Sequence, residues 1–132
     1  MPALGDLEVQ VMRRIWARRG PATVRDVLGD LQADRDIAYT TVMTVMGNLE
    51  KKGWLRRHPE GRAYRYEPLV SAEQYSSGLM RQALEASTDR PATLMHFIED
   101  LSADEARALE EAYRRLTGQR RAAVRASRGS RP

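Results

Sequence analysis

Residues 39–55, which read YTTVMTVMGNLEKKGWL, have the clearest periodicity in this chain of 132 residues. Apolar side chains recur there at i, i+3, i+4 and i+7, the spacing of one buried helix face: Val42, Val45, Met46 and Leu49. Gly53 follows at once, where a residue with positive φ commonly ends a helix. The stretch therefore predicts an amphipathic helix from Tyr39 to Lys52.

Two shorter helices are predicted upstream. Residues 6–18 place apolar side chains on one stripe at helical spacing: Leu7, Val11, Met12, Ile15 and Trp16. Gly20 and Pro21 interrupt this pattern, and Thr23 with Asp26 forms a weak capping box for the next helix. That second helix has its own buried stripe: Val24, Val27, Leu28 and Leu31.

A β-hairpin is predicted downstream. Residues 54–58 and 62–68 form two short extended runs, and we expect Pro59, Glu60 and Gly61 to make the turn between them. In the second run Tyr64 and Tyr66 share one face.

Three further helices are predicted after the hairpin. Ser71 with Gln74 and Ser102 with Glu105 are capping boxes, and Pro91 suits a first helical position. The order of three helices, a hairpin and three helices indicates a mainly α fold with a small β-hairpin wing. We expect a winged helix-turn-helix domain at residues 1–70, a helical dimerisation domain at residues 71–117 and a basic disordered tail at residues 118–132.

This order also predicts a nucleic-acid interface. In winged helix-turn-helix modules the third helix enters the major groove of DNA. Its outer face here is small and polar: Thr40, Thr44, Gly47, Asn48 and Lys51. Threonine methyls and Met43 suit contact with thymine methyls, and Asn48 suits pairing with adenine.

Charge is distributed unevenly along the chain, which has a formal net charge of +4. Residues 1–70 carry 12 basic and 9 acidic side chains, residues 71–117 carry 5 and 9, and residues 118–132 carry 5 arginines and no acid. The segment from Lys51 to Arg65 has six basic residues against Glu60 alone, a pattern suited to phosphate contact. The tail has two open interpretations, a solubilising segment or a weak non-specific DNA contact.

Several function classes are disfavoured. The chain has no cysteine, which excludes disulfides, thiol catalysis and cysteine metal sites. His58 and His96 have no second ligand at i+3 or i+4, and no phosphate loop or nucleophile motif is found, so no metal, cofactor or enzymatic activity is expected. With no apolar run of about 20 residues and no signal pattern, we expect a cytoplasmic protein without membrane insertion.

Several separated motifs resemble the penicillinase repressor (BlaI/MecI/CopY) family. They are Leu4–Glu8, Val11, Met12 and Trp16, Tyr39–Met46, Leu49–Leu55, Arg62–Val70 and Leu94–Glu99, and the resemblance covers about residues 4–116. It implies a homodimeric transcriptional repressor that binds a palindromic operator with TACA/TGTA half-sites. It also implies release after a β-lactam or cell-wall signal, when a membrane sensor metalloprotease cleaves the C-terminal region. The matching bond is His96–Phe97, although the family often has Asn before this Phe.

The expected roles fall into two groups of residues. The expected DNA contacts are Thr23, Arg25, Tyr39, Thr40, Thr41, Met43, Thr44, Gly47, Asn48, Lys51, Lys52, Arg62 and Arg65. The expected dimerisation residues are Leu79, Leu84, Leu94, Phe97, Ile98, Leu101, Leu109, Tyr113 and Leu116.

Two alternatives stay open. The apolar stripes of the rear helices pair with a second copy or fold back on their own winged domain. The winged helix itself is a DNA reader or an adaptor that binds protein without sequence-specific DNA binding.

Overall fold

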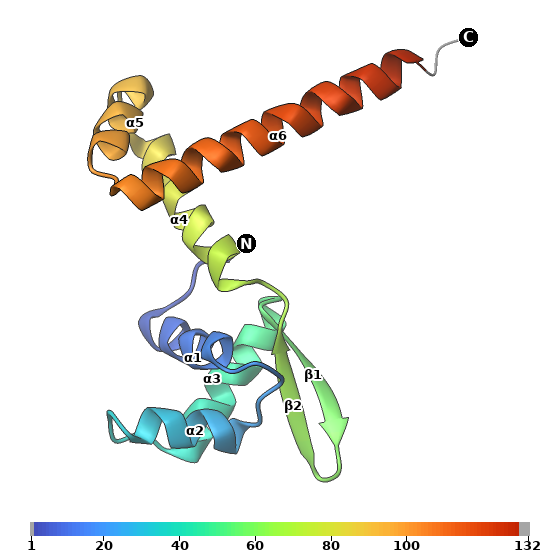
Figure 1. Cartoon of the computed structure of the whole chain (residues 1–132). Helices are drawn as coiled ribbons and strands as arrows, with labels where there is room; N and C mark the ends of the chain where they lie inside the picture. The colour runs from blue at the N-terminus through green and yellow to red at the C-terminus, as the bar shows by residue number, and fades with distance from the viewer. Residues whose placement is uncertain (1, 130–132) are drawn as a thin grey trace. The chain divides into compact units, whose positions relative to one another are not determined.

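The computed structural model describes residues 2–129 and has the predicted order of elements (Figure 1). The elements are α1 Asp6–Ala17, α2 Val24–Gln32, α3 Tyr39–Lys51, β1 Leu55–Glu60, β2 Ala63–Pro68, α4 Ala72–Ala86, α5 Arg90–Glu99 and α6 Ala103–Gly129. The chain divides into two compact units between Met80 and Arg81. The predicted fold class, mainly helical with a two-stranded wing, is confirmed.

The first unit has one hydrophobic core, formed by the predicted helical stripes. Nine of its side chains are almost completely buried: Val11, Met12, Ile15, Val27, Leu31, Val42, Met46, Leu49 and Leu55. The Thr23 hydroxyl accepts a hydrogen bond from Asp26 N–H (3.1 Å), and Asp26 accepts one from Thr23 N–H (2.9 Å), so the capping box is confirmed. Gly53 has a φ of 84° directly after α3, which explains why the helix ends there.

The hairpin pairs β1 with β2 in antiparallel register, with Arg57 opposite Tyr66 and Glu60 opposite Ala63. Its turn is therefore Gly61–Arg62, and the expected turn at residues 59–61 is wrong, because Pro59 and Glu60 lie within β1. Gly61 has a φ of 60°, as the first position of a tight hairpin turn requires. Pro59 is tolerated because β1 is an edge strand.

Two contacts join the hairpin and α4 to the helices. Ala22, just before α2, forms an isolated antiparallel bridge with Tyr66 of β2, with both backbone hydrogen bonds present (3.0 and 2.8 Å). At the start of α4 the Tyr75 ring packs against Trp16 and Trp54, with centroids 5.5 and 5.8 Å apart. The first unit consequently extends beyond the expected boundary at residue 70, to Met80.

The remaining helices form without a core of their own. Both predicted capping boxes are present, Ser71 with Gln74 and Ser102 with Glu105, and Asp89 additionally caps α5. Yet none of residues 71–128 is buried. Local capping therefore accounts for where these helices begin, while their apolar side chains stay open to solvent in one chain.

The expected disordered tail is corrected by α6, which continues to Gly129. Few apolar groups indicated disorder, but Arg and Ala are strong helix formers. Extending an existing helix also avoids the unfavourable nucleation step. Arg131 lies outside the described residues. Within residues 2–129, the helices are all too short or too polar to cross a bilayer.

Candidate nucleic-acid interface

The outer face of α3 presents free polar side chains to solvent. Thr40, Thr44 and Asn48 are exposed, and their side chains make no hydrogen bond within the described part of the chain. Below them Val42, Met46 and Leu49 are fully buried, which fixes the rotation of the helix about its axis. The exposed donors and acceptors are therefore held on a rigid base and remain available for an external partner.

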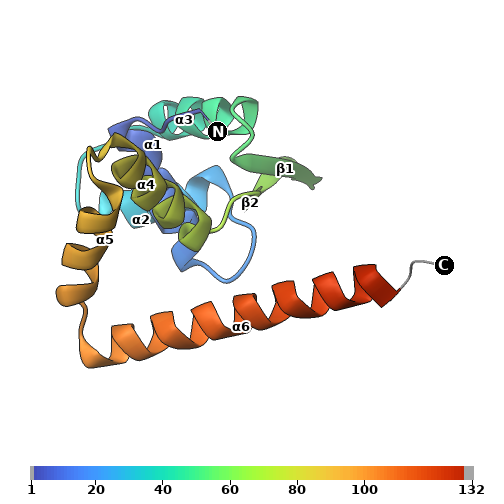
Figure 2. The same cartoon turned by 90° about the horizontal axis from the view of Figure 1, so that it is seen from above.

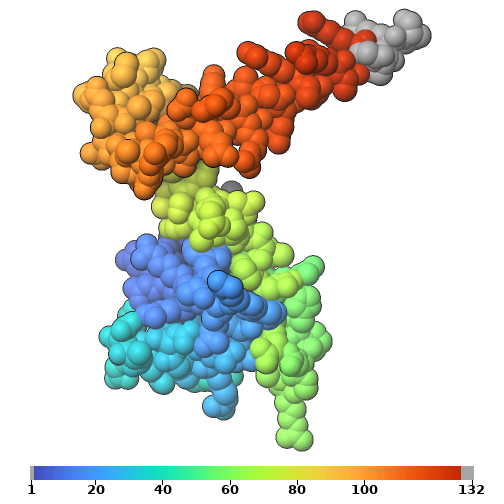
Figure 3. Space-filling view, viewed as in Figure 1, coloured from blue at the N-terminus to red at the C-terminus, as the bar shows by residue number. Residues whose placement is uncertain are grey.

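A hollow lies where α2, α3 and the hairpin approach one another, with a volume of about 510 Å³. Figure 2 shows the hairpin beginning at the end of α3, and Figure 3 shows its tip extending past the helices of the first unit. Five expected DNA contacts line this hollow: Thr23, Arg25, Tyr39, Met43 and Arg62. The fold thus brings together side chains that are separated by up to about 40 positions in the sequence.

Two further lining residues, Arg57 and Tyr64, are not among the thirteen expected DNA contacts. The Arg57 guanidinium lies 4.3 Å from the Tyr64 ring centroid, and its Nε is 3.2 Å from Glu50 Oε2 near the end of α3. On the other side of the hollow the Arg25 guanidinium is 5.5 Å from the Tyr39 ring. Side chains alternate between the two faces of a strand, and Arg57 pairs with Tyr66. This register places Arg57, Tyr64 and Tyr66 on the face of the hairpin that lines the hollow.

The positive segment from Lys51 to Arg65 is less basic in space than in sequence. Glu67 pairs with Arg56 and His58, Glu60 with Arg65, and Glu50 with Arg57. Lys51 and Arg62 are the cations of this segment that have no ionic partner within the described residues. The net charge of +5 counted along the chain therefore overstates the local field, because it omitted acids just outside the segment.

Lys52 is directed at the N-terminal segment. Its Nζ donates to Glu8 Oε1 (2.6 Å) and to the Ala3 carbonyl (3.3 Å). Burial acts to raise the pKa of Glu8, but the hydrogen bonds from Lys52 and from Gly5 N–H outweigh it, so this pKa is lowered. Lys52 thus has a structural partner, and Arg65 likewise pairs with Glu60 and donates to the Pro21 carbonyl (3.4 Å).

Hydrogen bonds also shift a carboxylate on the outer face of the wing. The pKa of Glu67 is lowered, first by its hydrogen bond with His58 (2.9 Å) and then by those from Arg56. This cluster lies on the strand face opposite Leu55 and Tyr66. It keeps Arg56 and Glu67 together across the hairpin.

The expected dimerisation residues lie exposed or half-buried on α4 to α6. Seven of them are between 44% and 72% exposed: Leu79, Leu94, Phe97, Ile98, Leu109, Tyr113 and Leu116. Leu84 and Leu101 are half-buried. Seven exposed large apolar side chains on three consecutive helices suit contact with a further partner.

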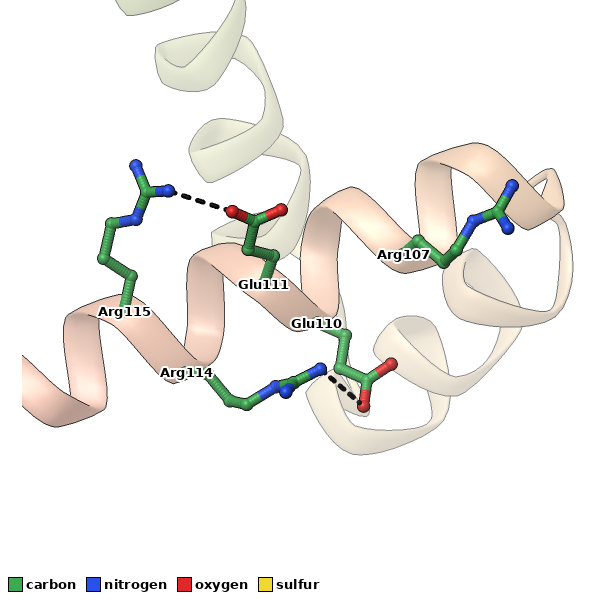
Figure 4. A pocket seen from close by; sticks show the side chains of 5 residues that line it. All are labelled: Arg107, Glu110, Glu111, Arg114 and Arg115. Atoms are coloured by element: carbon green, nitrogen blue, oxygen red, sulfur yellow. Dashed lines mark hydrogen bonds and ion pairs between the residues drawn. The ribbon is translucent and has the colours of Figure 1, made fainter.

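The His96–Phe97 bond lies within α5. The His96 side chain is 83% exposed and faces Glu99 at 3.6 Å. On α6 a shallow surface hollow is lined by Arg107, Glu110, Glu111, Arg114 and Arg115, and Figure 4 shows that Arg114 pairs with Glu110 and Arg115 with Glu111. Among the described residues no group of three potential metal ligands occurs.

Comparison with known proteins gives consistent matches. The model of the family "Penicillinase repressor" matches residues 4–115. The "Transcriptional regulator BlaI" of Mycobacterium tuberculosis is 47% identical over 116 residues, covering 86% of this chain and 84% of the relative. The "Penicillinase repressor" of Bacillus licheniformis is 31% identical over 75 residues, covering 57% of this chain and 58% of that protein.

One solved structure supports the assignment of the first unit. The solution structure of the DNA-binding domain of the repressor BlaI is 31% identical and superposes with a TM-score of 0.51. The match covers 56% of this chain and 89% of that domain.

Proposed function

The chain belongs to the penicillinase repressor family, and on that premise we propose that it represses transcription as a homodimer on a palindromic operator. It is a transcriptional repressor with a winged-helix DNA-binding domain, and it is not an enzyme. The finer features proposed here are the dimer, the operator and the mode of release.

One observation carries the DNA-reading role. The exposed, unpaired side chains of Thr44 and Asn48 stand on the outer face of α3, next to a hollow bordered by Arg25 and Arg62. A helix of this kind fits the major groove, and cations beside it suit the flanking phosphates. In the proposed complex α3 reads bases, while Lys51 and Arg62 hold the backbone.

The dimer is proposed from the exposed apolar side chains of α4 to α6. Without a buried residue between 71 and 128, these helices lack a core unless a second copy supplies the other half. Two linked winged domains bind two half-sites with a raised effective concentration for the second. TACA/TGTA half-sites arranged as a palindrome match such a twofold protein.

Release is proposed to follow proteolysis at His96–Phe97 by a membrane sensor metalloprotease, after a β-lactam or cell-wall signal. The high exposure of His96 supports access to this part of α5. A helical bond must open locally before a protease can accommodate it in extended form. Cleavage there separates α6 from the winged domain and removes the link between half-sites.

A gel-shift titration of the purified chain on DNA from its own promoter tests the function. We expect a complex that survives moderate salt and an excess of unrelated duplex. If binding shows no preference for the promoter DNA, the DNA-reading role is refuted. DNA affinity that is weak and nearly independent of salt would instead favour a protein-binding adaptor.

A further inference from the structure

The last third of α6 differs from the rest of that helix in its charge. After Glu111 no acid occurs in the chain, and the last third of the helix carries four arginines: Arg120, Arg121, Arg125 and Arg128. This segment lies beyond residue 115, where the match to the family ends. Its role is therefore a question for this chain's own residues.

The arginines in the two parts of α6 have different surroundings. Each of the three earlier ones pairs with an acid on the same helix: Arg107 pairs with Asp104, and Figure 4 shows the pairs of Arg114 with Glu110 and Arg115 with Glu111. The four later ones have no ionic or hydrogen-bond partner in the part of the chain that the structure describes. Unpaired guanidinium groups are therefore concentrated in one segment.

The four arginines lie along one side of the helix. Arg121, Arg125 and Arg128 follow at i, i+4 and i+7, which places them on one face, and Arg120 is adjacent to them. Together with Thr117 and Val124 they line a single shallow surface hollow. The guanidinium groups of this row therefore offer several planar hydrogen-bond donors on one side of the helix.

The helix dipole explains only part of this row. Cations stabilise the C-terminal end of a helix, but the effect falls off within the last turn. Arg120 and Arg121 lie about two turns before the end of α6, and like charges at i, i+4 destabilise a helix. A polyanion laid along this face would turn that repulsion into attraction.

We propose that Arg120, Arg121, Arg125 and Arg128 form a second DNA-contacting surface, which binds the phosphate backbone without reading sequence. The proposal rests on the proposed repressor function, since it adds a backbone contact to a protein that already binds DNA. Arginine suits this role because its planar fork binds phosphate oxygens in pairs. Joined to the winged domain by the same chain, the surface raises affinity for any duplex by multivalency.

The test compares two matched triple variants of the full chain. The first is Arg121→Gln, Arg125→Gln and Arg128→Gln. The control is Arg107→Gln, Arg114→Gln and Arg115→Gln, which removes the same charge from the same helix at ion-paired positions. Gln keeps a high helix propensity, and circular dichroism checks that both variants retain their helices.

Binding is measured as a function of salt on promoter DNA and on an unrelated duplex. We expect the first variant to lower affinity for both duplexes by the same factor, on the order of tenfold, and to flatten the salt dependence by about one to three counterions per chain. The control variant should keep the unmodified slope. If the unmodified chain binds both duplexes equally, the repressor function is refuted. In that case a flatter salt dependence in the first variant would still support DNA contact by the arginines of α6.

Two results would overturn the proposal. One is a salt slope in the first variant that equals that of the unmodified chain. The other is a change of oligomeric state in the first variant, measured by analytical ultracentrifugation, because loss of the dimer would then account for the weaker binding. That result would assign the arginines to a contact with acidic side chains of a second copy.

Discussion

At the scale of single residues, the first unit separates side chains that stabilise the fold from side chains left for a partner. Thr23, Asp26, Glu8 and Lys52 are used in internal hydrogen bonds, whereas Thr44 and Asn48 are not. Sequence periodicity could predict the outer face of α3, because it depends on helical spacing alone. It could not predict the partners of Lys52, because the contact with Glu8 exists only after folding.

The free side chains on α3 should separate base reading from backbone binding. We expect Asn48→Ala to reduce discrimination at one base position by about 1–3 kcal/mol, and Thr44→Ala to change the preferred base. Lys51→Ala and Arg62→Ala should instead weaken binding to every sequence and lower the salt slope by about one. Competition binding with single-base operator variants measures both effects. If the Thr44→Ala variant keeps the same base preference, Thr44 does not take part in base recognition.

The capping box of α2 should make stability depend on pH. Backbone hydrogen bonding from Thr23 lowers the pKa of Asp26 despite a raising effect of burial, so the folded state binds this proton less readily than the unfolded one. The stabilisation is complete above the ordinary Asp pKa of roughly 4 and is lost as the pH falls through the lowered folded pKa. We expect Asp26→Asn to cost about 1 kcal/mol at neutral pH and progressively less in acid. Urea unfolding at several pH values measures this, and a pH-independent difference would contradict it.

At the scale of elements, the sequence predicted each helix and the hairpin but misplaced two ends. Proline and glycine both favour turns and so predict a turn at residues 59–61, yet the two-residue turn at Gly61–Arg62 lets Pro59 stay in an edge strand. A turn at residues 59–61 would set Arg57 on the strand face opposite Tyr66, whereas the observed register places the two side by side. Low apolar content predicts disorder after residue 117, but the high helix propensity of Arg and Ala extends α6 to Gly129.

The extension of α6 can be tested at Gly118, which lies inside the helix with open space where a Cβ would be. Because Gly is less favourable than Ala in a helix by about 1 kcal/mol, we expect Gly118→Ala to raise the helical signal and to stabilise the segment. Gly118→Pro should disrupt the helix at this point, since proline costs about 3 kcal/mol in a helix interior. Circular dichroism of the full chain measures both changes. Equal helicity in the two variants would mean that this segment is not helical in solution.

At the scale of the whole molecule, the two units depend on a partner in different ways. The first unit buries its own core around Met12, Ile15 and Met46, and it leaves the outer face of α3 exposed. The helices after Val70 have no fully buried side chain in one chain and expose Phe97, Ile98 and Tyr113. This division supports a mechanism in which the reading unit stays folded while the linkage between copies is regulated.

A chain truncated after His96 should therefore retain base preference but lose affinity. It keeps all of the first unit and lacks α6, so we expect a monomer by ultracentrifugation whose preference for promoter DNA over unrelated duplex at a single half-site is unchanged. Binding to the full operator should fall by about 100-fold or more, because the second half-site no longer benefits from linkage. The Arg121, Arg125 and Arg128 triple variant is the control, since it removes the basic surface while leaving the apolar side chains for dimerisation. If the truncated chain binds the full operator as tightly as this control, loss of the dimer cannot be the release step, and cleavage at His96–Phe97 would not induce transcription.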